Sequence, residues 1–190
     1  QVIEEPASLS GNRISRRLTE RLIHDIAEGV DQLPILQHAL SQIWHAANQG
    51  KAEMDLIHYA MVGGMPSAEL PDDHLSLFSD WFGKLPEKIK QFYREPNLQN
   101  VLDTHANKLY ESAGEIYKTK SGKELAEGTV KAIIKAAFTC LTKIDQSRAV
   151  RNRMTLLEIT HILGRPDVTT SKVAEVLQIF REPGNTFIRP

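Results

Sequence analysis

The sequence predicts a mainly helical, all-α protein. Apolar residues recur three or four positions apart along most of the chain, which is the pattern of helices that bury one face. Glycines and prolines stand between these stretches, where helices commonly end and begin. Hydrophobic residues make up 41% of the 190 residues and charged residues 25%, so the chain can form one or two domains with a sizeable core.

Three helices are expected in residues 1–64. The first covers residues 13–28 and ends at Gly29, and its apolar stripe consists of Ile14, Leu18, Leu22 and Ile26. The second begins at Pro34, because the missing N–H of proline is no loss in the first turn of a helix. A short third helix near 55–62 closes at the pair Gly63-Gly64.

Residues 65–100 are less regular, because prolines divide the segment at positions 66, 71, 86 and 96. Aromatic residues lie between the prolines: Phe78, Trp81, Phe82, Phe92 and Tyr93. We expect two short helices that pack through these rings. The segment is interpreted either as an insertion that covers the surface or as a linker that folds onto the core.

The region 101–190 has the element order of a winged helix with a small β wing. Long helices are predicted from Leu98 onward and again up to Leu141, and a short strand at 149–154 follows. Thr155 and Glu158 form a capping box at the start of the next helix, and Thr169 or Thr170 can cap the last one. A turn at 183–184 and a strand at 185–189 complete the order helix, strand, helix, helix, turn, strand.

Charge and cysteine content argue against a nucleic-acid-binding protein, a protein of anionic membrane surfaces and a disulfide-bonded protein. The formal net charge is -1, which gives no electrostatic argument for binding nucleic acid or an anionic membrane. The single cysteine, Cys140, excludes an internal disulfide and fits a reducing cytoplasm. We find no run of about 20 apolar residues and no signal peptide in residues 1–6. Because residue 1 is not Met, we expect the sequence to be part of a longer chain.

No catalytic or metal-binding residue is predicted. The sequence contains neither a G-x-x-x-x-G-K-[ST] phosphate loop nor H-E-x-x-H, and its seven histidines are interpreted as structural. Basic residues outnumber acidic ones at 143–165. The basic residues are Lys143, Arg148, Arg151, Arg153 and Arg165, and the acidic residues are Asp145 and Glu158. This basic cluster suits a solvated edge, a nucleotide or partner domain, or DNA phosphates. DNA is the less favoured reading, because the helix at about 170–182 is balanced in charge.

An ordered set of segments resembles the novel STAND NTPase family of bacterial signalling proteins, in the part after the ATPase core. The segments are Ile3–Ala7, Gly11, the Leu18/Leu22 helix, Leu33–Leu40 with Trp44, Met61–Gly64, His105–Asn107 with Tyr110, Arg151–Arg153, Phe180–Gly184 and Phe187–Pro190. The resemblance implies a helical lid at 1–64 and a winged-helix domain at 101–190, separated by an insertion or linker at 65–100. Both domains would fold over a P-loop core and clamp its nucleotide.

The resemblance also implies a nucleotide-binding set of four residues. Leu33 and Pro34 correspond to the Gly-x-Pro-type motif that lies against the base and ribose, although the glycine of that motif is Gln32 here or is shifted to Gly29. Arg151 and Arg153 stand in for the His or Arg that contacts the phosphates. The expected ligand is ATP or ADP, with Mg²⁺ supplied by the core and no tight binding by this sequence alone.

We therefore expect a regulatory, nucleotide-sensing arm of a larger signalling ATPase, which is not itself catalytic. Its expected partners are the P-loop core of the same polypeptide, an effector or repeat domain and a second copy in a homo-oligomer, with no membrane contact. Two alternatives stay open. One is a DNA-binding winged-helix regulator, and the other is an adaptor that holds a partner through the aromatic segment at 65–100.

Overall fold

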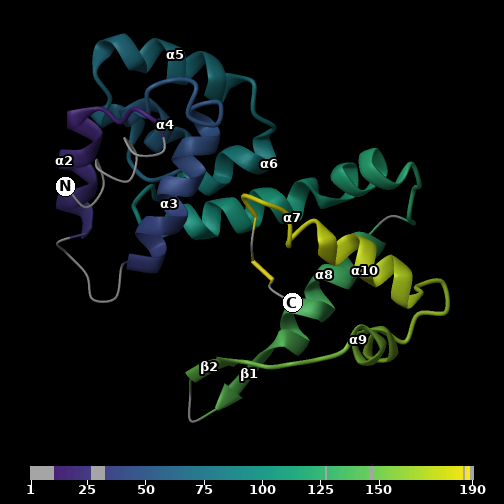
Figure 1. The fold of residues 1–190 in the computed structure, drawn as a ribbon. Helices are drawn as coiled ribbons and strands as arrows, with labels where there is room; N and C mark the ends of the chain where they lie inside the picture. The colour runs from purple at the N-terminus through teal and green to yellow at the C-terminus, as the bar shows by residue number, and fades with distance from the viewer. Residues whose placement is uncertain (1–10, 27–32, 127, 146–147, 186, 189–190) are drawn as a thin grey trace. The chain divides into compact units, whose positions relative to one another are not determined.

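The computed structural model describes residues 11–26, 33–126, 128–145, 148–185 and 187–188, and for 143–151 the backbone alone. Its described part is mainly helical, as predicted, with nine α-helices, two 3-10 helices and one β-hairpin (Figure 1). The helices are α2 (Arg16–Ile26), α3 (Leu33–Ala46), α4 (Leu56–Met61), α5 (Asp72–Gly83), α6 (Glu87–Lys90), α7 (Asn100–Ser121), α8 (Thr129–Leu141), α9 (Leu156–Leu163) and α10 (Thr170–Gln178). The 3-10 helices are η1 (Ser67–Glu69) and η2 (Gln91–Tyr93), and the strands are β1 (Thr142–Asp145) and β2 (Arg148–Arg151).

The chain divides into two compact units, residues 1–108 and residues 109–190, which we call the N-terminal and C-terminal units. The division falls within α7, so this helix contributes residues to both. In the N-terminal unit, α4 contacts α2, α3 and α5. The segment 65–100 shares the core of this unit, because its side chains Leu70, Phe78 and Leu98 are buried with those of α2 and α3.

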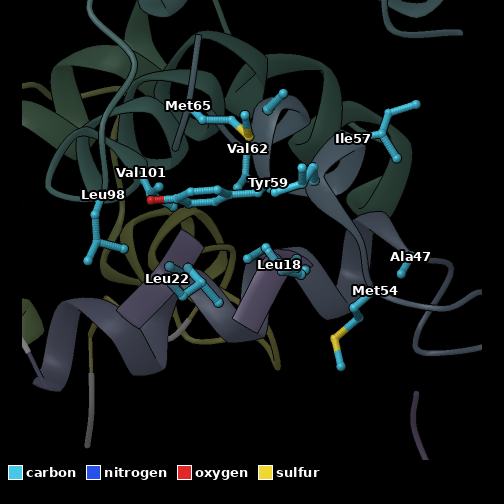
Figure 2. Packing of buried hydrophobic residues seen from close by; sticks show 14 of the residues in the cluster. Leu18, Leu22, Ala47, Met54, Ile57, Tyr59, Val62, Met65, Leu98 and Val101 are labelled. Atoms are coloured by element: carbon cyan, nitrogen blue, oxygen red, sulfur yellow. The ribbon is translucent and has the colours of Figure 1, made fainter. Parts of the chain in front are cut away.

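The core of the N-terminal unit is built around Tyr59 of α4, whose side chain is completely buried. Figure 2 shows its ring between Leu18 and Leu22 of α2 on one side and Met65 on the other. Gly64 lies directly against this ring, and a Cβ atom at position 64 would overlap ring carbons of Tyr59. Its neighbour Gly63 has a φ of +84°, which favours glycine. The predicted Gly63-Gly64 closure of α4 therefore has two separate physical reasons.

The C-terminal unit has its own core, formed where α8 packs against α9 and α10. The predicted caps are confirmed. Thr155 accepts the N–H of Glu158 at 3.2 Å while the Glu158 carboxylate accepts the N–H of Thr155 at 2.7 Å, which is the expected capping box of α9. Thr169 caps α10 by accepting the N–H of Lys172.

The β-structure of the C-terminal unit differs from the prediction. β2 overlaps the strand expected at 149–154, but it pairs antiparallel with β1, which was not predicted, and Thr142 faces Arg151. The hairpin precedes α9, whereas a wing follows the last helix. The predicted strand at 185–189 is wrong for its described residues, because the N–H groups of Phe187 and Ile188 both donate to the carbonyl of Phe180 and turn the chain back. The part of the chain described after α10 therefore shows no β wing.

The packing at Gly64 gives a test of the N-terminal core. Gly64→Ala should lower the free energy of unfolding by about 1–3 kcal/mol or more, because the added methyl group must displace the Tyr59 ring. Gly83→Ala is the matched control in the same unit, since a Cβ there meets nothing within 4 Å and alanine favours the helix. Urea unfolding of both variants measures the difference. Equal stability of the two would show that Tyr59 is not confined by Gly64.

Candidate functional site

The start of α3 places Leu33 and Pro34 at the surface. Leu33 is 60% exposed and Pro34 is also exposed. Behind them Leu36, Ala39 and Ile43 are buried, so the helix is held to the core by its opposite face. No acidic residue lies in the first turn of α3, and its first N–H groups therefore face no negative charge from that turn. Gln32 and Gly29, the two alternative positions for the glycine of the motif, lie outside the described residues.

His38, one turn further along α3, pairs with His105 of α7. Nε2 of His38 lies 3.1 Å from Nδ1 of His105, and the ring centroids are 5.1 Å apart. Such a hydrogen bond needs one nitrogen as donor and the other as unprotonated acceptor. Burial lowers the pKa of His38, which keeps the imidazole neutral. The pair therefore links the helix that carries Pro34 to the helix that enters both units.

A second polar cluster joins α2, α4 and α5. Asp55, the N-cap of α4, accepts hydrogen bonds from Ser15 Oγ at 2.6 Å and from Arg17 Nε at 2.8 Å. Arg17 also donates to Nε2 of His74 at 2.9 Å. Burial opposes ionisation of Asp55, but the donors from Arg17, Ser15 and the Leu56 N–H outweigh it and hold the pKa of Asp55 at about 2. Ser15 Oγ and the Nε and Nη2 atoms of Arg17 all donate within the cluster, so we assign it to stability.

The C-terminal unit presents the two predicted arginines differently. Arg151 ends β2, and its side chain lies outside the described residues. Arg153 is exposed in the connection between β2 and α9. Between them Asn152 donates its side-chain amide to the carbonyl of Cys140 and its N–H to the carbonyl of Leu141, both at 2.8 Å. The motif Arg151-Asn-Arg153 thus fixes the base of the hairpin through its middle residue and leaves Arg153 free to point into solvent.

Leu33 and Pro34 belong to the N-terminal unit and the two arginines to the C-terminal unit. Their joint role at one nucleotide therefore stays a prediction. The contact of His38 with His105 could not be predicted from the sequence, because these residues lie 67 positions apart and no spacing rule connects them. Both do belong to segments that carry the family resemblance, which was the available signal.

Comparison with known proteins bears on the first part of the chain. Residues 1–69 match the family model of Novel STAND NTPase 1. The match supports the resemblance to STAND NTPases in 69 of the 190 residues, and these include α2, α3 and α4. Searches of curated proteins and of solved structures gave no match. For residues 70–190 the resemblance therefore stays a prediction.

The described residues contain no group of three or more His, Cys, Asp or Glu side chains that could hold a metal ion. No helix in the same part of the chain is both long and apolar enough to cross a membrane.

The histidine pair predicts a pH dependence. Because folded His38 binds a proton more weakly than the unfolded chain, the free energy of unfolding should fall as the pH drops below the ordinary histidine value of 6.5. His58, whose pKa burial also lowers, contributes in the same direction. The His38→Gln variant should lose less of its free energy of unfolding as the pH falls below 6.5. The matched control is His24→Gln, because His24 is exposed, and this variant should show the same decrease as the wild type. Urea unfolding between about pH 8 and pH 5 measures the effect, and an unchanged pH dependence in His38→Gln would contradict the assignment.

The Asp55 cluster predicts a separate effect at lower pH. Asp55→Asn should lower the free energy of unfolding by about 1–3 kcal/mol at neutral pH, because Arg17 loses its charged acceptor. A carboxyl with a depressed pKa stabilises the fold above its unfolded value of 3.8 and loses that contribution as the pH falls toward about 2. Asp55→Asn has no carboxyl group to protonate at this position, so its free energy of unfolding should not show this decrease. Glu20→Gln, which breaks the exposed Arg16–Glu20 pair, should change the stability by less than about 0.5 kcal/mol.

Proposed function

We propose that this chain is the regulatory, nucleotide-sensing arm of a STAND-type signalling ATPase. It would act on a P-loop core in the same polypeptide and convert the ATP or ADP state into a conformational change or oligomerisation. The observation that carries the proposal is the position of Leu33 and Pro34. They lie within the residues that match the STAND NTPase family, and they are exposed at the start of a helix whose other face is buried.

The residues at the start of α3 fit one wall of a nucleotide site. The exposed Pro34 ring is rigid and apolar, which suits contact with a base, and the N–H groups of the first turn suit an electronegative atom. The described residues near this point include no phosphate-binding loop, so the core would hold the phosphates and Mg²⁺. Arg151 and Arg153 are proposed as phosphate contacts from the C-terminal unit.

The same contacts suggest how a change at the nucleotide reaches the rest of the arm. Leu36, Ala39 and Ile43 attach α3 to the core, and His38 attaches it to α7. A shift of α3 would therefore act on α7, which has residues in both units. Such a switch requires only that the arm has different affinities for two states of the core.

The proposal is tested with the polypeptide that carries the P-loop core. Pro34→Ala should weaken nucleotide binding on the order of tenfold, equivalent to about 1.4 kcal/mol, while the unfolding free energy of the arm changes less. Pro86→Ala is the matched control, because Pro86 is also exposed and precedes a helix, α6. Isothermal titration with ATP and ADP measures the affinities. Equal nucleotide affinity in Pro34→Ala and the wild type would remove the sensing role of Pro34.

A further inference from the structure

Two half-buried imidazole rings, those of His38 on α3 and His105 on α7, meet inside the N-terminal unit. Nε2 of His38 lies 3.1 Å from Nδ1 of His105, and the ring planes are tilted by 31°. A zinc–nitrogen bond is about 2.0–2.1 Å long, so two nitrogens on one ion in tetrahedral or octahedral geometry lie about 2.8–3.4 Å apart. The distance that suits the hydrogen bond therefore also suits two ligands of one metal ion.

Both rings project from helices whose buried faces hold them in place. On α3, Ala39 directly follows His38 and is 0% exposed. On α7, Thr104 directly precedes His105, is 2% exposed and donates its hydroxyl to the carbonyl of Phe92 at 3.1 Å. The spacing of the two nitrogens is thus set by the fold, and an ion that binds them loses little free energy to ordering its ligands.

The chemistry of the pair favours a transition-metal ion. Imidazole nitrogens suit Zn²⁺, Ni²⁺ and Cu²⁺, whereas Mg²⁺ and Ca²⁺ prefer oxygen ligands. A metal ion needs unprotonated ligand nitrogens, and burial lowers the pKa of His38, which keeps that ring neutral. The hydrogen between the two nitrogens leaves its position when the donor ring takes its other neutral tautomer, with the proton on its second nitrogen. The ion therefore replaces the hydrogen bond without a net release of protons.

We propose that His38 and His105 form a binding site for a divalent transition-metal ion of the Zn²⁺ type, which links α3 to α7. The ion bonds to Nε2 of His38 and Nδ1 of His105, and water completes its coordination. No third His, Cys, Asp or Glu side chain in the described part of the chain joins this pair in a possible metal cluster. Structural zinc sites use four protein ligands, so we expect an exchangeable ion on which folding does not depend.

The ion would bind close to the proposed nucleotide contact. His38 lies about one helical turn after Pro34 on α3. A bond from His38 through the ion to α7 would restrict the movement of α3 and thereby of its exposed start. Zinc binding itself needs neither a nucleotide nor a P-loop core, so the metal site and the nucleotide-sensing role can fail separately.

Calorimetric titration of the full chain with ZnCl₂ tests the proposal, with protein that carries no histidine tag and a buffer that does not chelate metals. We expect one zinc ion per chain and no comparable heat from MgCl₂. In a ¹H–¹⁵N NMR titration, zinc should shift most strongly the amide signals of residues 37–39 and 104–106. His38→Gln and His105→Gln should each weaken zinc binding at least about tenfold, equivalent to about 1.4 kcal/mol, because a single imidazole remains.

His24→Gln is the matched control, because His24 is an exposed histidine of α2 and its loss should leave zinc binding unchanged. Urea unfolding without zinc shows whether each variant is folded, and the NMR titration of the wild type needs no variant. Three results would contradict the proposal. They are zinc binding no stronger than that of Mg²⁺, amide shifts centred away from His38 and His105, and wild-type zinc affinity in a folded His38→Gln or His105→Gln. Each would leave the pair as a hydrogen bond alone, and none bears on Pro34→Ala.

Discussion

The buried side chain of Tyr59 sets the arrangement of the N-terminal unit. Its ring fills the space against Gly64, and its hydroxyl donates to Asp25 of α2 at 2.8 Å. Asp25 in turn accepts from Arg21, which also pairs with Glu69 of η1. A buried tyrosine without a partner for its hydroxyl would cost free energy, so the ring and the ion pairs stabilise the same arrangement. Through them α2, α4 and the start of the segment 65–100 are fixed together.

This arrangement explains how an exposed proline can be held in a defined position. α3 packs on α4, and its buried residues Leu36, Ala39 and Ile43 share the core that contains Tyr59. Pro34 needs no contact of its own, because the helix behind it is anchored along the buried face and at His38. The exposed end is then available for a ligand, because the burial of the opposite face of α3 already offsets the conformational entropy lost when the helix is ordered.

The sequence predicted correctly the elements that depend on interactions between residues close in the chain. The stripe of Leu18 and Leu22, the capping box at Thr155 and the cap at Thr169 depend on residues within about one or two helical turns, and the structure confirms them. β1 was missed because Thr142–Asp145 directly continues an apolar helical run, and only pairing with β2 distinguishes it. The strand at 185–189 failed for a similar reason, since the carbonyl of Phe180 captures both N–H groups that a strand would use. Of the candidate site, the exposed start of α3 followed from Pro34, but the contact of His38 with His105 depends on the tertiary fold.

The segment 65–100 is held to the N-terminal unit by apolar side chains and by a half-buried lysine. Leu70, Phe78 and Leu98 attach it to the core, whereas Gly83 and Lys84 are exposed. Burial of Lys108 disfavours the charged form of its ammonium group and lowers its pKa. The rings of Trp81 and Tyr93 offset part of that cost through cation–π contacts, typically about 0.5–2 kcal/mol each.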